Sequence, residues 1–252
     1  MNNVIILLTH VWNDNIKDLH DKLSDCHKTL ILFDETSSFY NDELRSLDNI
    51  RFFNDDKIKE TGMEKYYPMP KNKDIKEGEL MFNNFSAILT IKDELLQYDY
   101  IYIWEYDVRF NGDYHTLFDV MSNLNDDMLS TNLTTYIYNA NDEWWPHLNA
   151  GVFYKSLNKE KTMLDIPKEY WVCSIMPFCR FSKKAMKLLI RELPKYPEYF
   201  EILVPTLCFF NYLKISDCIF IDNEHVTNKQ TFDWRPQQGP MNQINKIYHA
   251  IK

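Results

Sequence analysis

The chain has 252 residues, enough for one α/β domain with a large core, and 45% of them are hydrophobic, as in a well-packed globular protein. A net charge of −9 and the lack of a basic stripe with interleaved aromatic residues argue against nucleic acid as a partner. Only five glycines are present, without a GxGxxG or GxxxxGK motif, which argues against a Rossmann-type dehydrogenase and a P-loop NTPase.

The cysteines and the N-terminus indicate the compartment. Five cysteines without a CxxC pair are typical of buried free thiols in a reducing compartment, not of a zinc site or a disulfide framework. The N-terminus lacks the basic start of a signal peptide, and no stretch approaches the roughly 20 apolar residues of a membrane span. We therefore expect a soluble, cytoplasmic protein. Its lysine- and asparagine-rich composition is typical of an AT-rich viral or bacterial genome.

The first third of the chain predicts strands that end in polar residues. Residues 4–8 and 29–33 are apolar runs typical of buried strands, with a helix predicted between them over 15–23. Polar residues after the first two strands lie where an α/β fold commonly holds a nucleotide. They are Thr9, His10 and Asp34. Alternatively, His10 is an ordinary loop histidine and Asp34 a solvated turn acid.

A third short strand is expected over 49–53, a long polar loop over 55–76 and one helix over 78–98. Residues 100–104 then form an aromatic and β-branched run that we expect to be buried on both faces of a sheet.

An acidic pair ends this central strand. Alternation along the strand would put Glu105 and Asp107 on the same side, at the carboxyl end of the sheet. Paired carboxylate oxygens there can hold Mg2+ or Mn2+, and such an ion binds diphosphates. The alternative is an acidic turn that caps the next helix, predicted over 114–124.

The second half predicts a strand over 127–133 and a polar loop that carries Trp144, Trp145 and His147. The two tryptophans are either buried anchors of a lid or a stacking platform for a sugar ring. Residues 173–180 have no clear period, and Arg180 within them could contact a phosphate or pair on the surface. Ser182 is a plausible N-cap for a helix over 183–193, and a last strand is expected over 218–221.

Two further groups could carry chemistry. Glu201 stands beside an apolar helix, predicted over 207–213, where the pKa of a carboxyl can rise as a general base requires; otherwise it is a helix-start glutamate that favours the dipole. His249 and Lys252, at the C-terminal end, could be a metal ligand and a phosphate contact, or simply solvated side chains.

Together these features resemble the nucleotide-diphosphosugar glycosyltransferases of the GT-A fold. The segment WEYDVRF resembles the Asp-x-Asp metal motif of that superfamily in a Glu-x-Asp form. It is similar in particular to little-studied fungal and viral glycosyltransferase-like families that carry a W-x-x-D-V-R-F/Y-x-G pattern. The resemblance implies an α/β fold with a mixed, mostly parallel central sheet flanked by helices. It also implies one catalytic domain over 1–252, with a donor and metal half (1–113) and an acceptor half that ends in a closing segment (114–252).

The resemblance further implies roles for individual residues. Asp107 would coordinate Mn2+ or Mg2+, Glu105 would bind the metal or the donor ribose, and Glu201 would be the base of an inverting reaction. His249 would be the third metal ligand; because Ala250 stands where many family members have proline, His225 is the alternative. The donor contacts would be Thr9, His10, Asp34, Arg109 and Lys252, and the acceptor contacts Trp144, Trp145 and His147. Arg109 could instead hold the acidic loop by an ion pair.

The implied reaction moves a hexosyl or pentosyl group from a UDP-, GDP- or dTDP-linked sugar to a glycan or another hydroxyl acceptor. Two other functions compete with it. One is a metal-dependent nucleotidyltransferase or phosphodiesterase that uses Glu105 and Asp107. The other is a carbohydrate-binding or scaffold protein on a degenerate transferase fold, in which Trp144 and Trp145 bind the sugar.

Overall fold

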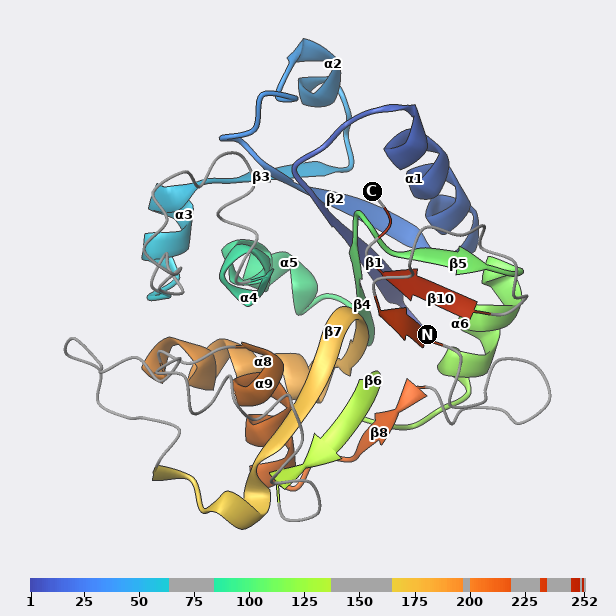
Figure 1. The fold of residues 1–252 in the computed structure, drawn as a ribbon. Helices are drawn as coiled ribbons and strands as arrows, with labels where there is room; N and C mark the ends of the chain where they lie inside the picture. The colour runs from blue at the N-terminus through green and yellow to red at the C-terminus, as the bar shows by residue number, and fades with distance from the viewer. Residues whose placement is uncertain are drawn as a thin grey trace.

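The expected α/β architecture is confirmed by a computed structural model, which describes residues 1–63, 84–136, 165–196, 200–218, 232–234, 246–249 and 251. A seven-stranded sheet forms its centre, in the order β3-β2-β1-β4-β7-β6-β8 (Figure 1). β7 runs antiparallel to β4 and β6, and the other neighbouring pairs are parallel. The strands are β1 (Asn3–Thr9), β2 (Lys28–Asp34), β3 (Ile50–Phe53), β4 (Tyr100–Glu105), β6 (Met128–Thr135), β7 (Val172–Ser182) and β8 (Ile215–Asp217).

Helices cover both faces of this sheet, because its central strands present apolar side chains on both sides. In β1, Val4, Ile6 and Leu8 pack into one hydrophobic layer, and Ile5 and Leu7 pack into the other. The first layer contains α3 (Asp55–Glu60), α4 (Asn84–Ile88), α5 (Lys92–Leu95), α8 (Lys183–Glu192) and α9 (Phe200–Phe210), and the second contains α1 (Asp14–Cys26), α2 (Asp42–Arg45) and α6 (Tyr114–Ser122). None of the helices in the described part of the chain has the length and apolar character that crossing a membrane requires.

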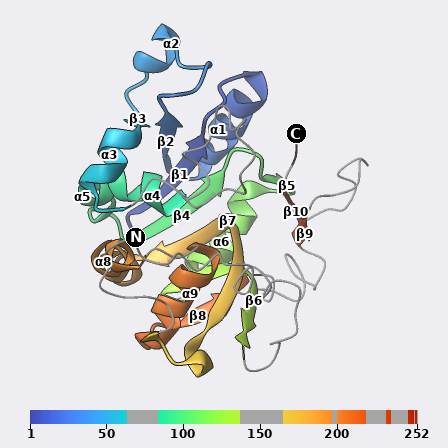
Figure 2. The same cartoon turned by 60° about the vertical axis from the view of Figure 1, so that its left-hand side comes forward.

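A small second sheet lies beside the carboxyl end of β4. It consists of β5 (Arg109–Asn111), β10 (Lys246–His249) and β9 (Phe232–Trp234), with β10 in the middle. Figure 2 shows this sheet close to the C-terminal end of the chain. Short turns join β4, β5 and α6, so the small sheet is held against the edge of the large one at the acidic motif.

Several elements differ from the sequence-based expectation. The predicted loop over 55–76 begins with α3, which Asn54 caps by accepting a hydrogen bond from Lys57 N at 3.1 Å. Within the predicted helix 78–98, the described residues form α4, a 3-10 turn (Leu89–Ile91) and α5 in succession. The strand expected over 218–221 is not the last one: β8 ends just before that range, and β9 and β10 follow it. Residues 219–221 lie outside the described part.

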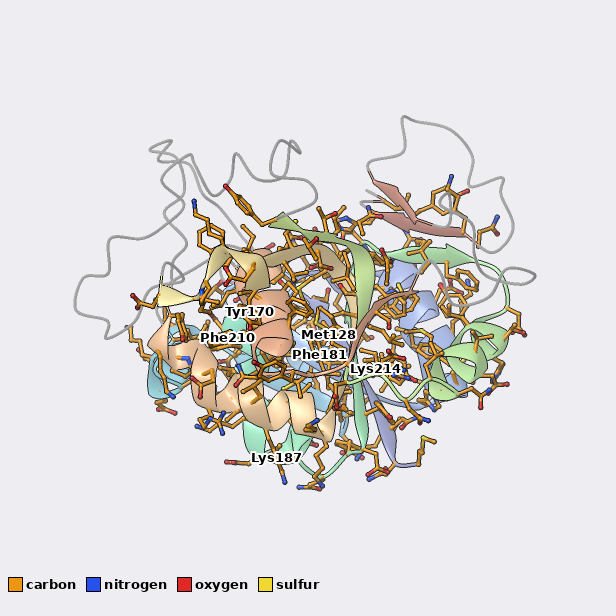
Figure 3. All side chains as sticks on the ribbon, turned by 90° about the horizontal axis from the view of Figure 1, so that it is seen from below. Met128, Tyr170, Phe181, Lys187, Phe210 and Lys214 are labelled. Atoms are coloured by element: carbon orange, nitrogen blue, oxygen red, sulfur yellow. The ribbon has the colours of Figure 1, made fainter. Side chains whose placement is uncertain are left out.

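The segment 173–180 belongs to β7, the longest strand described, which the sequence did not reveal. Its residues are buried from Val172 to Phe181, so no alternation of polar and apolar residues marks it. Met128 of β6 and Phe181 of β7 are cross-strand partners beneath α8 and α9 (Figure 3). The helix expected over 207–213 is instead α9, which begins at Phe200 and contains Glu201 in its first turn. The other predicted strands and helices in the described part are confirmed within a few residues, including α8 with its N-cap Ser182. The division of the chain at residue 113 stays a prediction.

Arg180 of β7 is fully buried and bonded to backbone carbonyls, so neither predicted role for it holds. Its Nη2 donates to the carbonyls of Leu124 and Asp126 at 2.9 Å each, and its Nη1 donates to the carbonyl of Met121. Its guanidinium carbon lies 4.3 Å from the ring centroid of Tyr100. Carbonyls at the C-terminus of a helix attract a cation, so Arg180 fixes the connection from α6 to β6.

Replacing Arg180 by Met should lower the free energy of unfolding by about 2–4 kcal/mol, because two buried carbonyls and one partly buried carbonyl lose their donor. Lys187→Met is the control, since Lys187 projects from the outer face of α8 into solvent (Figure 3). Urea unfolding followed by circular dichroism measures both. Equal unfolding free energies for the two variants would contradict the assigned role of Arg180.

Candidate metal centre

Three potential metal ligands converge at the carboxyl end of β4. Glu105, Asp107 and His249 each offer one ligand atom, and these atoms all lie within 4.8 Å of one another. The side chains are 17%, 13% and 11% exposed, so the cluster is close to the surface but largely screened from solvent. Two carboxylates and one imidazole are a ligand set that divalent cations accept.

A turn brings the two acids together, where the sequence indicated strand alternation. β4 ends at Glu105, and the backbone N–H of Val108 donates to the carbonyl of Glu105 at 3.1 Å, which closes a turn around Tyr106 and Asp107. The buried indole Nε1 of Trp104 donates to the carbonyl of Val108 at 3.1 Å. The turn is therefore anchored from the core side, and its two carboxylates are held in place.

The pairing of β10 with β5 delivers the histidine. Tyr248 pairs with Arg109 in this antiparallel ladder, which carries His249 alongside the residues just before β5. The backbone N–H of Ile251 donates to the carbonyl of Asp107 at 2.9 Å, so the pairing continues onto the acidic turn itself. Residues more than a hundred positions apart in sequence thus meet through backbone hydrogen bonds.

His249 Nε2 lies 3.3 Å from Glu105 Oε2 and 3.3 Å from Asp107 Oδ1. Burial alone would lower the pKa of His249, but contact with the two carboxylates and their negative charge outweigh burial and raise it to about 9. Burial raises the pKa of Glu105, against the opposing effects of His249 and of the hydrogen bond from Asn84.

The residues fit a divalent cation. Asp107 Oδ1 is buried and accepts no well-aligned hydrogen bond from the described residues, although His249 Nε2 lies nearby. Two carboxylate oxygens lie 3.3 Å from His249 Nε2, and they attract a proton or a metal ion to the space among the three groups. Hard carboxylate oxygens with one imidazole suit Mn2+ and Mg2+, so the structure agrees with the predicted ligand set.

The predicted nucleotide contacts lie at the ends of β1 and β2, beside the acidic turn. The imidazole of His10 packs edge-on against the ring of Tyr106, with 4.6 Å between centroids. Burial raises the pKa of Asp34, against the hydrogen bonds from Thr36 and the charge of nearby His10. Asp34 Oδ2 is buried and accepts no hydrogen bond from the residues that the structure describes. Thr9 is fully buried, and its hydroxyl donates to the carbonyl of Val11 at 2.7 Å.

Arg109 braces the acidic turn through backbone atoms. Its Nη1 donates to the carbonyl of Tyr106 at 2.6 Å and to that of Val108 at 2.9 Å. Burial lowers the pKa of its guanidinium, with smaller opposing contributions from neighbouring acidic groups. The sequence suggested an ion pair as the way in which Arg109 would hold this loop; its hydrogen bonds to the loop go to backbone carbonyls instead.

Glu201 lies in the first turn of α9 and is 8% exposed. Its Oε1 accepts a hydrogen bond from the backbone N–H of Met176 at 3.3 Å. Trp104 of β4 pairs with Phe178 of β7. Because the two strands are antiparallel, Met176, which comes two residues before Phe178, lies beyond the last residue of β4. Glu201 is thereby held at the edge of the sheet where the candidate metal ligands lie.

Five of the predicted site residues lie outside the described part of the chain: Trp144, Trp145, His147, His225 and Lys252. Conversely, sequence reasoning missed Asn84, whose side-chain Nδ2 donates to Glu105 Oε1. The sequence marks Asn84 only as part of an Asn-x-Ser sequon, which gives no signal for this contact.

The raised pKa of His249 makes the stability of the metal-free protein depend on pH. Since its folded pKa is about 9 and its unfolded pKa about 6.5, the stabilisation is fully present below pH 6.5 and is lost as pH rises through 9. We expect the difference in unfolding free energy between wild type and His249→Gln to shrink by about 2–3 kcal/mol over that range.

Chemical unfolding in EDTA at a series of pH values measures this difference. His115→Gln is the control, because His115 is exposed on α6. If the difference in unfolding free energy between wild type and His249→Gln stays constant between pH 6.5 and 9, the charged contact of His249 with the two carboxylates is ruled out.

The comparisons with known proteins give one sequence family and several structures of low similarity. No curated protein sequence matches the chain. An apo structure of WbbM, a bifunctional glycosyltransferase, is similar at 14% identity and a TM-score of 0.40, over 85% of this chain and 38% of that one. The chain therefore spans well under half of WbbM.

Two further structures are similar along most of their length. A mutant of LgtC matches at 10% identity and a TM-score of 0.46, over 99% of this chain and 87% of that one. The apo form of mouse xyloside xylosyltransferase 1 matches at 14% identity and a TM-score of 0.39, over 98% and 96%.

The family model that matches is described as "Protein of unknown function (DUF3405)", and the match covers residues 5–169. Those residues include the acidic motif with Glu105 and Asp107, together with β4 and β5 on either side of it. Because the match extends over more than half of the sequence, this chain belongs to the DUF3405 family.

Proposed function

We propose that the protein is a metal-dependent glycosyltransferase that moves a sugar from a nucleotide-diphosphate sugar to a hydroxyl acceptor. The observation that carries this proposal is the cluster of Glu105, Asp107 and His249 at the carboxyl end of β4. The ends of β1 and β2 adjoin it in the same sheet, which is where open α/β sheets bind ligands.

In this proposal Glu105, Asp107 and His249 hold Mn2+ or Mg2+. The ion, when bound, neutralises the developing charge of the diphosphate leaving group. The protein as a whole carries a net charge of −9 and repels an anionic donor, so a local positive centre is required for binding. Arg109 stiffens the acidic turn and adds one more positive charge beside it.

The donor's nucleoside would lie over the ends of β1 and β2. Asp34 supports this position, because a buried carboxylate oxygen without a hydrogen-bond donor is costly unless a ligand provides one. A ribose hydroxyl or a base N–H of a UDP-, GDP- or dTDP-linked sugar would be such a donor. His10 and Tyr106 offer ring edges and faces at the same edge of the sheet. We assign Thr9 to the shape of its loop and Lys252 to the diphosphate.

Glu201 is the proposed general base. In an inverting displacement, Glu201 takes the proton of the acceptor hydroxyl as that oxygen bonds to the anomeric carbon and the bond to the diphosphate breaks. The hydrogen bond from Met176 N to Oε1 fixes the orientation of the Glu201 carboxylate. Trp144, Trp145 and His147 are proposed to contact the acceptor, a glycan or another hydroxyl compound.

A thermal-shift series tests the donor site. UDP-, GDP- and dTDP-sugars are added with and without Mn2+ to wild type, Asp107→Ala and the control Asp119→Ala, whose aspartate is exposed on α6. One nucleotide class should raise the melting temperature with Mn2+ in wild type and in the control, and should fail to do so in Asp107→Ala.

Absence of a shift for all three classes would count against the transferase. Turnover of a nucleoside triphosphate with a sugar phosphate would instead favour the nucleotidyltransferase. Binding of free oligosaccharide without any nucleotide would favour the carbohydrate-binding protein.

Replacing Glu201 by Gln separates its role as general base from its role as hydrogen-bond acceptor for β7. The amide oxygen can still accept the hydrogen bond from Met176 N, but the amide cannot take a proton from the acceptor. We expect transfer to nitrophenyl glycoside acceptors to fall by roughly 10²–10⁴-fold, with the donor-induced thermal shift unchanged. Glu169→Gln, at an exposed glutamate, should leave transfer as in wild type. Full transfer activity in Glu201→Gln would restrict Glu201 to holding β7.

A further inference from the structure

The two carboxylate oxygens of Glu105 have different partners. Oε2 faces His249 Nε2 at 3.3 Å, within the proposed metal centre. Oε1 accepts a hydrogen bond from the side-chain amide of Asn84. A carboxylate can only accept, so the nitrogen of the Asn84 amide must face it. Oε2 is thus directed to the proposed metal centre, and Oε1 is hydrogen-bonded to Asn84.

Asn84 is well placed to hold this orientation. It is 3% exposed and begins α4, which packs against the sheet through fully buried Ala87 and Ile88. The ring of the next residue, Phe85, contacts Phe181 of β7 with 5.5 Å between centroids. Because α4 is fixed in the core, rotating Glu105 to bring both oxygens onto a metal would break a partly buried, charge-assisted hydrogen bond.

We propose that Asn84 restricts Glu105 to one metal-ligating oxygen and thereby determines which cation the site prefers. The inference rests on the proposed metal centre and adds to it a specificity-determining residue. Asn84 acts as a positioning residue, since it touches Glu105 and not the ion. The expected preference is for Mg2+ and Mn2+ over Ca2+.

The preference follows from coordination chemistry. Mg2+ demands near-octahedral geometry with short bonds to single oxygens and keeps several water or phosphate ligands. Ca2+ takes six to eight oxygens at longer distances and often binds a carboxylate through both oxygens. With Oε1 held by Asn84, Glu105 offers the single oxygen that suits the smaller ions. Without that hydrogen bond, Glu105 can turn and chelate Ca2+ with both oxygens.

The test measures dissociation constants for Mn2+, Mg2+ and Ca2+ on the metal-free protein by isothermal titration calorimetry. Asn84→Leu keeps the volume and removes the donor, and Asn84→Ala is a second variant in case the first does not fold. Thr90→Val is the matched control, because Thr90 lies in the 3-10 turn after α4 and its hydroxyl donates to the carbonyl of Ala87. Circular dichroism verifies that each variant is folded.

In wild type and Thr90→Val, Mn2+ and Mg2+ should bind more tightly than Ca2+. In both Asn84 variants the ratio of Ca2+ to Mn2+ dissociation constants should fall by about tenfold or more, since loss of an outer-shell partner typically weakens metal binding by 10–100-fold. If Asn84 had a purely structural role, the Asn84 variants would bind all three cations more weakly by the same factor, or would only have a lower melting temperature.

The outcomes separate the two levels of the argument. Binding of none of these cations to wild type would overturn the metal centre, and the inference with it. Tight Mn2+ binding with an unchanged Ca2+ to Mn2+ ratio in the Asn84 variants would overturn the inference alone and leave the proposed function standing.

Discussion

The site depends on one backbone interaction, the antiparallel pairing of β10 with β5. β5 begins two residues after Asp107, so the register of this ladder decides which side chain of β10 lies beside the acidic turn. The register places His249 there, and the hydrogen bond from Ile251 N to the carbonyl of Asp107 extends the contact. A shift of one residue would turn the imidazole to the opposite face, because side chains alternate along a strand.

The cluster of charged groups is tolerated because each member has a support. Two carboxylates a few ångströms apart repel each other unless a cation lies between them. Here the protonated imidazole of His249 supplies the positive charge, or a bound metal ion would supply it instead. Asn84 donates a hydrogen bond to Oε1 of Glu105. Trp104 and Arg109 fix the turn through backbone carbonyls. The arrangement is therefore pre-organised before a ligand arrives, which lowers the cost of binding.

The rest of the sheet serves as the rigid base for this edge. β4 is buried on both faces and lies between β1 and β7, so it can move little. β7 runs antiparallel to β4, so Met176 in the first half of β7 lies at the edge where β4 ends. Its hydrogen-bond partner Glu201 lies at the same edge. Arg180 of the same strand uses its charge to close the connection between α6 and β6. A single strand therefore contributes to the core, to a loop and to the candidate site.

Local sequence determined the elements whose signal is local. The apolar run before Glu105 predicted β4 and its burial, and the acids at its end predicted two of the candidate metal ligands, because strand composition and the position of carboxylates can be read within a few residues. β7 was hidden because a strand buried on both faces lacks alternation. Its one charged residue, Arg180, donates hydrogen bonds to backbone carbonyls that are distant in sequence. Asn84 and the register that selects His249 were decided only by the tertiary structure. Both depend on contacts between segments far apart in the chain, and single-sequence patterns contain no information on which distant segments meet.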